Sequence, residues 1–245
     1  VIKINDLDLM SSLGVVGKDP RGAVAYKFPA DEVTTEVVDI CINVGRTGVL
    51  TPYAILQPVN VGGVVVKQVT LHNLDFVKDK DIRVGDTVII KRAGDVIPYV
   101  VSSISSVRKG TEVIFEPPSE CPSCGSIVNQ NDDTVALYCT NVSCSAQVIR
   151  CLEHFVSRST LEIDGFGKGI AKQLVDSGLI EDVADIYFLD RENLLEIEGF
   201  ADKKVDSLLL AIEESKCKPI NRLIEALGIR GVGNVASADL GRQFG

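Results

Sequence analysis

Cys121-Pro122-Ser123-Cys124 and, after 14 intervening residues, Cys139-Thr140-Asn141-Val142-Ser143-Cys144 stand near the middle of this 245-residue chain. Each close pair can present two thiolates from one tight turn, and four thiolates suit one tetrahedral zinc ion. Two disulfides would need an oxidising compartment, whereas the total of seven cysteines is odd. A redox Cys-x-x-Cys would leave the second pair without a role. The pattern therefore predicts a structural zinc site, and its ligands are Cys121, Cys124, Cys139 and Cys144.

The sequence changes character across this segment. Before the cysteines, short runs rich in Val and Ile alternate with Gly, Pro and Asn, which is typical of short strands and turns. We expect five strands, at residues 37–42, 49–56, 64–71, 87–91 and 96–104. Five strands at this spacing suit a small closed barrel of the OB type, although composition alone allows a sandwich nearly as well.

The region after the cysteines is predicted to be helical. Apolar residues recur at helical spacing between residues 148 and 156, and Ser145 is expected to cap that helix. Three similar turns follow, with their first glycines 34 and 32 residues apart: Ile163-Asp164-Gly165-Phe166-Gly167, Ile197-Glu198-Gly199-Phe200-Ala201 and Ile229-Arg230-Gly231-Val232-Gly233. A helix pattern follows each turn, which indicates tandem helix-hairpin-helix units. A plain helical bundle with glycine C-caps is the alternative.

The composition of these turns suits phosphate binding. Glycine allows a positive φ and a close approach, so backbone N–H groups at the start of the next helix can point at a phosphate oxygen. Such contacts do not depend on base sequence and need little side-chain charge. We therefore predict DNA binding at Gly165, Gly167, Gly199, Gly231 and Gly233. The middle turn, with Ala201 in its third place, is expected to be the weakest and could be purely structural.

Charge and composition limit the remaining functions. The net charge is −9, with 13 basic and 15 acidic residues in 1–120 and 12 basic and 19 acidic residues thereafter, which argues against a broadly basic nucleic-acid surface. Any such binding must therefore be local. No run approaches the roughly 18 apolar residues of a membrane span, and no targeting segment is visible. We expect a soluble, cytoplasmic monomer without a membrane partner.

The first 29 residues contain two lysines in strand-like settings. Lys3 alternates with apolar neighbours, and Lys27 follows small residues; either can bind phosphate or simply face water at a strand edge. Val1-Ile2-Lys3-Ile4-Asn5-Asp6 and Asp19-Pro20-Arg21-Gly22-Ala23-Val24-Ala25-Tyr26-Lys27-Phe28-Pro29 resemble the last two nucleotidyltransferase motifs of the bacterial NAD-dependent DNA ligases. The resemblance implies that Lys3 and Lys27 are catalytic and contact the adenylate of the cofactor.

Two loops of the predicted barrel carry arginines beside glycines. An arginine in such a loop, considered alone, is more often a solvated turn residue than a ligand contact, and this holds for both Arg46 and Arg92. However, Val44-Gly45-Arg46-Thr47-Gly48, Thr70-Leu71-His72-Asn73 and Lys91-Arg92-Ala93-Gly94-Asp95-Val96-Ile97-Pro98 resemble the OB domain of the same family. The resemblance implies that Arg46, Thr47 and Arg92 contact DNA near a nick.

The resemblance covers essentially the whole chain and implies a multidomain fold. Residues 1–32 would be the strand remnant of the nucleotidyltransferase (adenylation) domain, 33–118 an all-β OB barrel, 119–145 a four-cysteine zinc finger and 146–245 an all-α helix-hairpin-helix domain. The family seals nicks in duplex DNA by AMP transfer from NAD⁺ to the 5′-phosphate and joining to the 3′-hydroxyl, with Mg²⁺ or Mn²⁺.

The family's nucleophilic lysine, in a Lys-x-Asp-Gly motif, should lie upstream of Val1. The chain also begins in strand-like alternation without Met, so we expect a fragment that does not adenylate itself. The alternative is a non-catalytic DNA-binding scaffold of zinc and helix-hairpin-helix modules.

Overall fold

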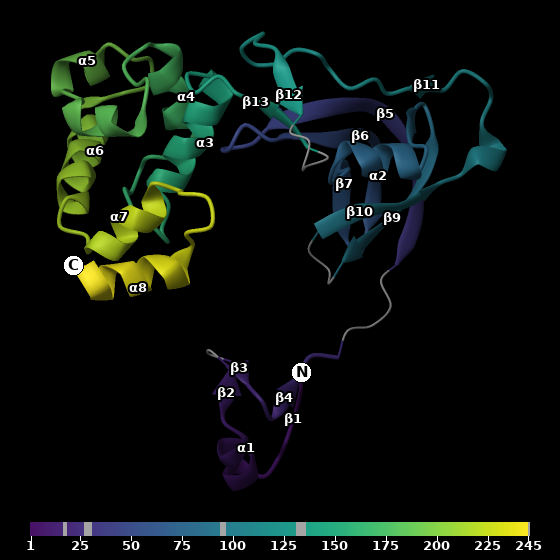
Figure 1. Cartoon of the computed structure of the whole chain (residues 1–245), viewed down its shortest axis with the longest axis horizontal. Coiled ribbons are helices and arrows are strands. Elements are labelled where there is room, and N and C mark those ends of the chain that lie inside the picture. The colour runs from purple at the N-terminus through teal and green to yellow at the C-terminus, as the bar shows by residue number, and fades with distance from the viewer. Residues whose placement is uncertain (17–18, 27–30, 94–96, 131–135, 245) are drawn as a thin grey trace. The chain divides into compact units, whose positions relative to one another are not determined.

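The computed structural model describes residues 1–16, 19–26, 31–93, 97–130 and 136–244 (Figure 1). The chain forms two compact units. The first comprises Val1–Ile40, Ala54–Leu71 and Lys80–Phe115, and the second comprises Cys41–Tyr53, His72–Asp79 and Glu116–Gly245. Among the helices of the described ranges, none has the length and apolar character that crossing a bilayer requires.

The N-terminal segment is a small strand remnant. It consists of β1 (Ile2–Lys3), α1 (Leu7–Leu13), β2 (Val15–Val16), β3 (Asp19–Pro20) and β4 (Ala23–Val24). Strand β1 pairs antiparallel with β4, and β2 with β3. The Asp6 side chain caps α1 by accepting hydrogen bonds from the N–H groups of Asp8 and Leu9, both at 3.0 Å. The strand expected around Lys27 ends at Val24, and Lys27 itself lies outside the described residues.

Five strands close into a barrel, which confirms the OB prediction over the sandwich. They are β5 (Glu32–Val44), β6 (Leu50–Val61), β7 (Val64–Thr70), β9 (Thr87–Ala93) and β10 (Ile97–Ser103). Their order around the barrel is β10-β7-β6-β5-β9, and β10 closes it by pairing antiparallel with β9 and parallel with β7. Apolar residues at alternate positions point inward and are buried, as the pleat of a strand requires. They include Ala54, Leu56, Val88 and Ile90, and Val37, Val66, Val69 and Val100 are buried as well.

An ion-pair network around the buried Asp86 carboxylate connects the segment before β9 to the segment after β10. Short strands β8 (Arg83–Val84) and β11 (Val113–Ile114) pair antiparallel, and η1 (Ser105–Val107) precedes β11. The Asp86 side chain is fully buried and accepts hydrogen bonds from Arg108 Nε and Nη2, at 2.7 and 2.8 Å, and from the Arg83 N–H at 2.8 Å. Arg108 also pairs with Asp81, at 2.5 Å. Arg108 thus neutralises the buried carboxylate, whose desolvation would otherwise be costly.

The second unit contains a two-stranded cysteine module followed by helices. Its elements are α2 (Leu74–Asp79), β12 (Val128–Gln130), β13 (Leu137–Cys139), α3 (Ser145–Phe155), α4 (Lys168–Asp176), η2 (Val183–Phe188), α5 (Arg191–Leu195), α6 (Asp202–Ser215), α7 (Ile220–Ala226) and α8 (Asn234–Phe244). The helices from α3 to α7 share one apolar core, which includes Leu152, Phe155, Leu161, Phe166, Leu174, Ile186, Leu194, Val205, Leu208 and Ile212. Each predicted hairpin turn lies between two packed helices: α3 and α4, α5 and α6, or α7 and α8.

The predicted cap of the first helix is wrong by one residue. Ser145 is the first residue of α3, and Cys144 occupies the N-cap position without a side-chain hydrogen bond. The free N–H of Ala146 is instead 3.3 Å from the hydroxyl oxygen of Ser123, which accepts its hydrogen bond. Because Ser123 lies between Cys121 and Cys124, the cysteine turn itself supplies the cap of the helix.

Candidate metal centre and nucleic-acid interface

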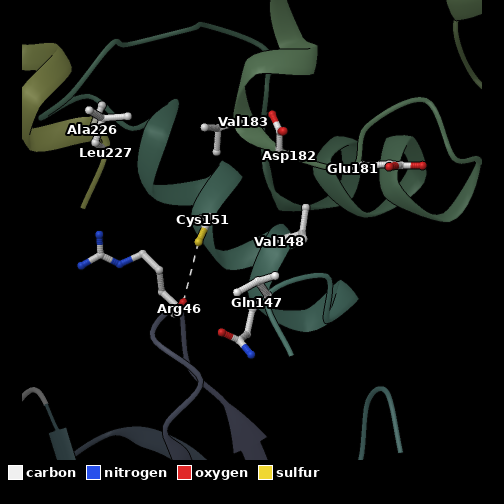
Figure 2. Close-up of a pocket in the computed structure, with 10 residues that line it drawn as sticks. Arg46, Gln147, Val148, Cys151, Glu181, Asp182, Val183, Ala226 and Leu227 are labelled. Atoms are coloured by element: carbon white, nitrogen blue, oxygen red, sulfur yellow. Dashed lines mark hydrogen bonds between the residues drawn. The ribbon is translucent and has the colours of Figure 1, made fainter. Parts of the chain in front are cut away.

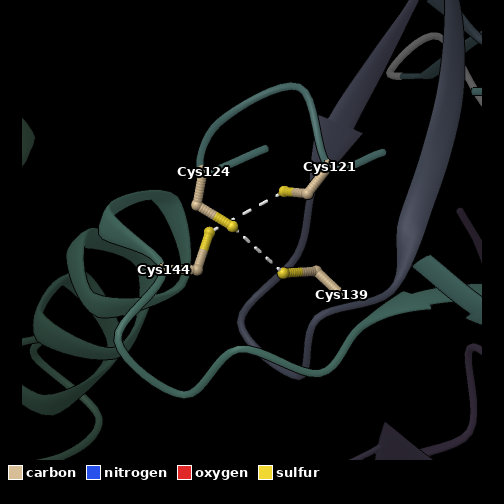
Figure 3. Close-up of side chains that lie close together, drawn as sticks. All are labelled: Cys121, Cys124, Cys139 and Cys144. Atoms are coloured by element: carbon tan, nitrogen blue, oxygen red, sulfur yellow. Dashed lines mark hydrogen bonds between the residues drawn. The ribbon is translucent and has the colours of Figure 1, made fainter. Parts of the chain in front are cut away.

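Four cysteine side chains converge in the second unit, as the sequence predicted (Figure 3). The Sγ atoms of Cys124 and Cys139 are 3.6 Å apart, those of Cys121 and Cys144 are 3.9 Å apart, and all four lie within 4.8 Å of one another. A tetrahedral zinc ion with Zn–S bonds of about 2.3 Å requires S–S separations of about 3.8 Å. The spacing therefore fits a zinc ion, and we assign the site as structural zinc with four thiolate ligands.

The surroundings of the sulfurs support a cation. Cys121, Cys139 and Cys144 are buried, and Val44 and Leu50 pack against them. Burial raises the pKa of Cys139 to about 12, whereas the Ser126 hydroxyl lowers the pKa of Cys124 to about 6. Four thiolates in such a place need a bound cation for charge balance. A shell of four protein ligands leaves no open position for a reacting molecule, so the role is structural.

The turn between β5 and β6 is built into the cysteine module. Gly48 has a φ of +79°, and a Cβ there would stand 2.3 Å from the carbonyl oxygen of Cys139. The Cys139 N–H donates to the Gly48 carbonyl at 2.9 Å, and Gln147 Nε2 donates to the Cys139 carbonyl at 3.0 Å. The second glycine of the Gly-Arg-Thr-Gly stretch is thus required by a close approach to a zinc ligand.

Arg46, predicted to contact DNA, is half-buried inside the second unit (Figure 2). Its carbonyl oxygen is 3.7 Å from Cys151 Sγ, and its Nη1 atom is buried without a hydrogen-bond acceptor among the described residues. The guanidinium packs against Gly228, where a Cβ would lie 1.7 Å from Nη1, and beside a cavity of about 310 Å³. Thr47 is exposed. DNA contact by both residues stays a prediction, and the packing of Arg46 is a role that the motif did not reveal.

The other predicted contacts lie in the first unit. Arg92 is half-buried, and its Nη1 donates to the carbonyls of Val61 and Gly62 at 3.3 and 3.1 Å, at the turn between β6 and β7. Lys3 is exposed on β1, opposite Ala23. Their DNA and adenylate contacts stay predictions, as does the role of Lys27.

The three hairpin turns have one geometry. Gly165, Gly199 and Gly231 have φ values of +84°, +81° and +82°, and in each turn the next residue donates its N–H to the carbonyl two positions before the glycine, at 3.0–3.2 Å. Gly167 and Ala201, the N-caps of α4 and α6, are extended, with φ of −91° and −98°. An alanine therefore fits the backbone conformation of the third place, and the weaker DNA binding expected of the middle turn stays a prediction.

The charged residues beside the turns also differ. A hollow of about 490 Å³ lies at the first turn, and its lining includes two cations, Arg158 and Lys168, and two carboxylates, Glu153 and Asp164. In the middle turn Asp202 is the first helical residue, so its carboxylate occupies the positive end of α6 and pairs with Arg191. Lys204 there is engaged, donating to the Gly199 carbonyl at 3.2 Å. Asp202 was not among the predicted residues, although a carboxylate directly after the turn is visible in the sequence.

The net charges of the three helix pairs also set the middle pair apart. Residues 145–176 hold four basic and four acidic residues, and residues 220–244 hold three basic and two acidic. Residues 191–215 hold three basic and seven acidic, a net charge of −4. The middle pair is therefore the least suited to a phosphate backbone.

A closed OB barrel, a four-cysteine zinc module and tandem helix-hairpin-helix turns together define a class of multidomain protein. Comparison with known families narrows this class. Residues 34–112 match the NAD-dependent DNA ligase OB-fold domain, 120–146 match the NAD-dependent DNA ligase C4 zinc finger domain, and 158–214 match the SAM-like helix-hairpin-helix tandem.

Relatives of similar sequence carry the name DNA ligase. That of Herpetosiphon aurantiacus is 52% identical over 244 residues, which cover 100% of this chain and 36% of the relative. Those of Chloroflexus aurantiacus and Roseiflexus castenholzii are 51% and 48% identical over 246 residues, covering 100% of this chain and 35% and 34% of the relatives. The chain belongs to the NAD-dependent DNA ligases, and it spans about a third of the length of these relatives.

Proposed function

We propose that this chain is the part of an NAD-dependent DNA ligase that binds nicked duplex DNA and holds the nick for sealing. The observation that carries the proposal is the repeated hairpin turn. At each turn a glycine of positive φ leads into a helix whose first N–H groups precede the first intrahelical hydrogen bonds, at Ala171, Lys204 and Ser237. Such N–H groups bind phosphate irrespective of base sequence.

The first and third turns are the phosphate sites in this proposal. Arg158 and Lys168 support the first, and Arg230 belongs to the third. The carboxylate of Asp202 disfavours a second anion at the middle turn. On the barrel, Arg46, Thr47 and Arg92 would add contacts near the nick, and for Arg46 this requires the guanidinium to leave its position against Gly228.

The sealing chemistry is proposed from the family. NAD⁺ would supply the adenylyl group, and Mg²⁺ or Mn²⁺ would support the phosphoryl transfers. Lys3, exposed on β1, and Lys27 would neutralise phosphate charge while AMP moves to the 5′-phosphate and leaves when the 3′-hydroxyl attacks. A Lys-x-Asp-Gly motif does not occur in these 245 residues, so we propose that they seal only DNA that is already adenylated.

The test compares binding of the chain to a nicked and an intact duplex and assays sealing of a pre-adenylated nick. We expect tighter binding to the nicked duplex and sealing that Lys3→Ala abolishes. Lys216→Ala is the matched control, since Lys216 lies on the surface just after α6 and pairs with Glu213. Equal binding to both duplexes without sealing would overturn the ligase proposal in favour of a DNA-binding scaffold. Absence of binding would overturn both.

A further inference from the structure

Glu162, the residue before the first hairpin turn, holds an unusual backbone conformation. Its φ is +53°, in the left-handed region that glycine adopts most readily. Its N–H donates to the Ser157 carbonyl at 2.9 Å, and the next N–H, of Ile163, donates to Val156 at 3.1 Å. The chain thereby reverses over the end of α3 and enters the turn. A glutamate here suggests that its side chain has a function.

The carboxylate of Glu162 joins the first hairpin to the third helix pair. Its Oε2 atom is 2.7 Å from Lys218 Nζ, just before α7, and 3.9 Å from Arg222 Nη1 on α7. The hydrogen bond from Lys218 is the main cause of a lowered pKa for Glu162. The ion pair is therefore formed at neutral pH, and it links residues 56 positions apart.

Arg222 holds the same loop by its backbone. Its Nη1 donates to the carbonyls of Arg158 and Thr160, at 2.8 and 2.9 Å. Thr160 is fully buried, and its hydroxyl lies 2.6 and 2.8 Å from the carbonyls of His154 and Phe155 at the end of α3. The loop of residues 157–162 is thus fixed to α3 on one side and to two cations of the third helix pair on the other.

This loop carries Arg158, which lines the hollow at the first hairpin together with Lys168 and the carboxylates of Glu153 and Asp164. The position of Arg158 therefore decides whether a cation can reach a phosphate there. We infer that Glu162, Lys218 and Arg222 are positioning residues that set this phosphate site, so that the first and third helix pairs bind the DNA backbone as one braced unit. The acidic middle pair connects them in the chain and does not contribute a phosphate contact. The inference rests on the proposed binding of DNA by the hairpins.

The sign of one substitution effect tests the inference. Removing a carboxylate beside a phosphate site lowers charge repulsion, so simple electrostatics predicts that Glu162→Gln binds duplex DNA more tightly. The positioning role predicts the opposite. We expect the affinity for a fluorescently labelled nicked duplex to fall about two- to fivefold, the range of a partly exposed ion pair. The slope of log K against log salt should also become shallower, by up to about 0.9 if the Arg158 contact is lost.

Two further variants make the result specific. Glu162→Gly accepts the left-handed backbone without strain, so weaker binding by this variant, with unchanged helical circular dichroism, separates positioning from folding. Glu213→Gln is the matched control, since it removes an exposed carboxylate that pairs with Lys216 and holds no loop of the hairpins. Both Glu162 variants should bind more weakly and the control should not.

Affinity that is unchanged or tighter in both Glu162 variants would overturn the inference while leaving the proposed function intact. Equal weakening in the Glu213→Gln control would overturn it as well, because any surface ion pair would then suffice. Failure of the unsubstituted chain to bind duplex DNA would overturn the proposed function and, with it, this inference.

Discussion

Gly48→Ala should loosen the zinc module. A Cβ at this φ of +79° costs about 1–2 kcal/mol in backbone strain. The same Cβ would stand 2.3 Å from the Cys139 carbonyl, far inside ordinary contact, so the turn must move away. That movement breaks the 2.9 Å hydrogen bond from the Cys139 N–H to the Gly48 carbonyl and leaves a buried group unpaired, at about 1–3 kcal/mol. Together with the strain, the total is about 2–5 kcal/mol.

Gly63→Ala provides the matched control. Gly63 has nearly the same φ, +78°, but a Cβ there meets no atom within 4 Å, so only the strain of about 1–2 kcal/mol applies. The difference of about 1–3 kcal/mol should appear as a loss of zinc affinity of roughly tenfold or more in Gly48→Ala alone, because metal binding and folding of the module are coupled. Competition with a chromogenic zinc chelator measures it. Equal zinc affinity in the two variants would refute the reasoning.

Three further predictions concern the charge network and the hairpins. Arg108→Met leaves the buried Asp86 carboxylate without its charge partner and should destabilise the barrel by about 3–5 kcal/mol in urea unfolding followed by circular dichroism, and a loss below about 1 kcal/mol would contradict this. Arg83 and Arg108 lower the pKa of Asp81 from 3.8 to about 2, so its stabilisation is complete above about pH 4 and is lost as the pH falls through about 2. Asp81→Asn should therefore flatten the stability curve in this window of an acid titration, and an unchanged curve would show that the pair contributes nothing. Gly165→Ala should weaken duplex binding about tenfold, as expected for a hydrogen bond to phosphate of about 1.5 kcal/mol, whereas Gly199→Ala, at nearly the same φ, should not, and equal losses in fluorescence anisotropy would assign the middle turn to DNA as well.

The barrel was predictable because its signal is local. Each of the five Val- and Ile-rich runs became a barrel strand, since alternate burial on a pleated strand leaves a period of two in the sequence. Closure was not decidable from composition, because it depends on pairing between segments far apart, such as Tyr99 with Thr70. The zinc site was predictable for the same reason, because its signal is also local: two close pairs of cysteines suit one tetrahedral metal ion better than disulfides or a redox site.

The error in the cap of α3 arose because a distant residue decides the outcome. The cap of α3 comes from Ser123, whose hydroxyl oxygen accepts a hydrogen bond from the N–H of Ala146, 23 residues later. The sequence pattern indicated the neighbouring Ser145 instead. Arg46 looks like a free loop cation in its motif, yet its guanidinium packs on Gly228. The middle turn was expected to be the weakest because of Ala201, and this stays a prediction. The adjacent Asp202 gives it a second reason, because its carboxylate lies at the start of α6.

The β5–β6 turn also decides where this chain can be divided. Family boundaries near residues 112 and 120 invite a cut between the barrel and the cysteine module. Such a cut would expose Val44 and Leu50 on the barrel fragment, although both are buried against the cysteines in the uncut chain, with only 4% and 2% of their surface exposed. The other fragment would lose the Gly48 carbonyl, which accepts the hydrogen bond from the Cys139 N–H. For expression, crystallisation or domain exchange, the barrel and the zinc module should therefore be kept together in one fragment.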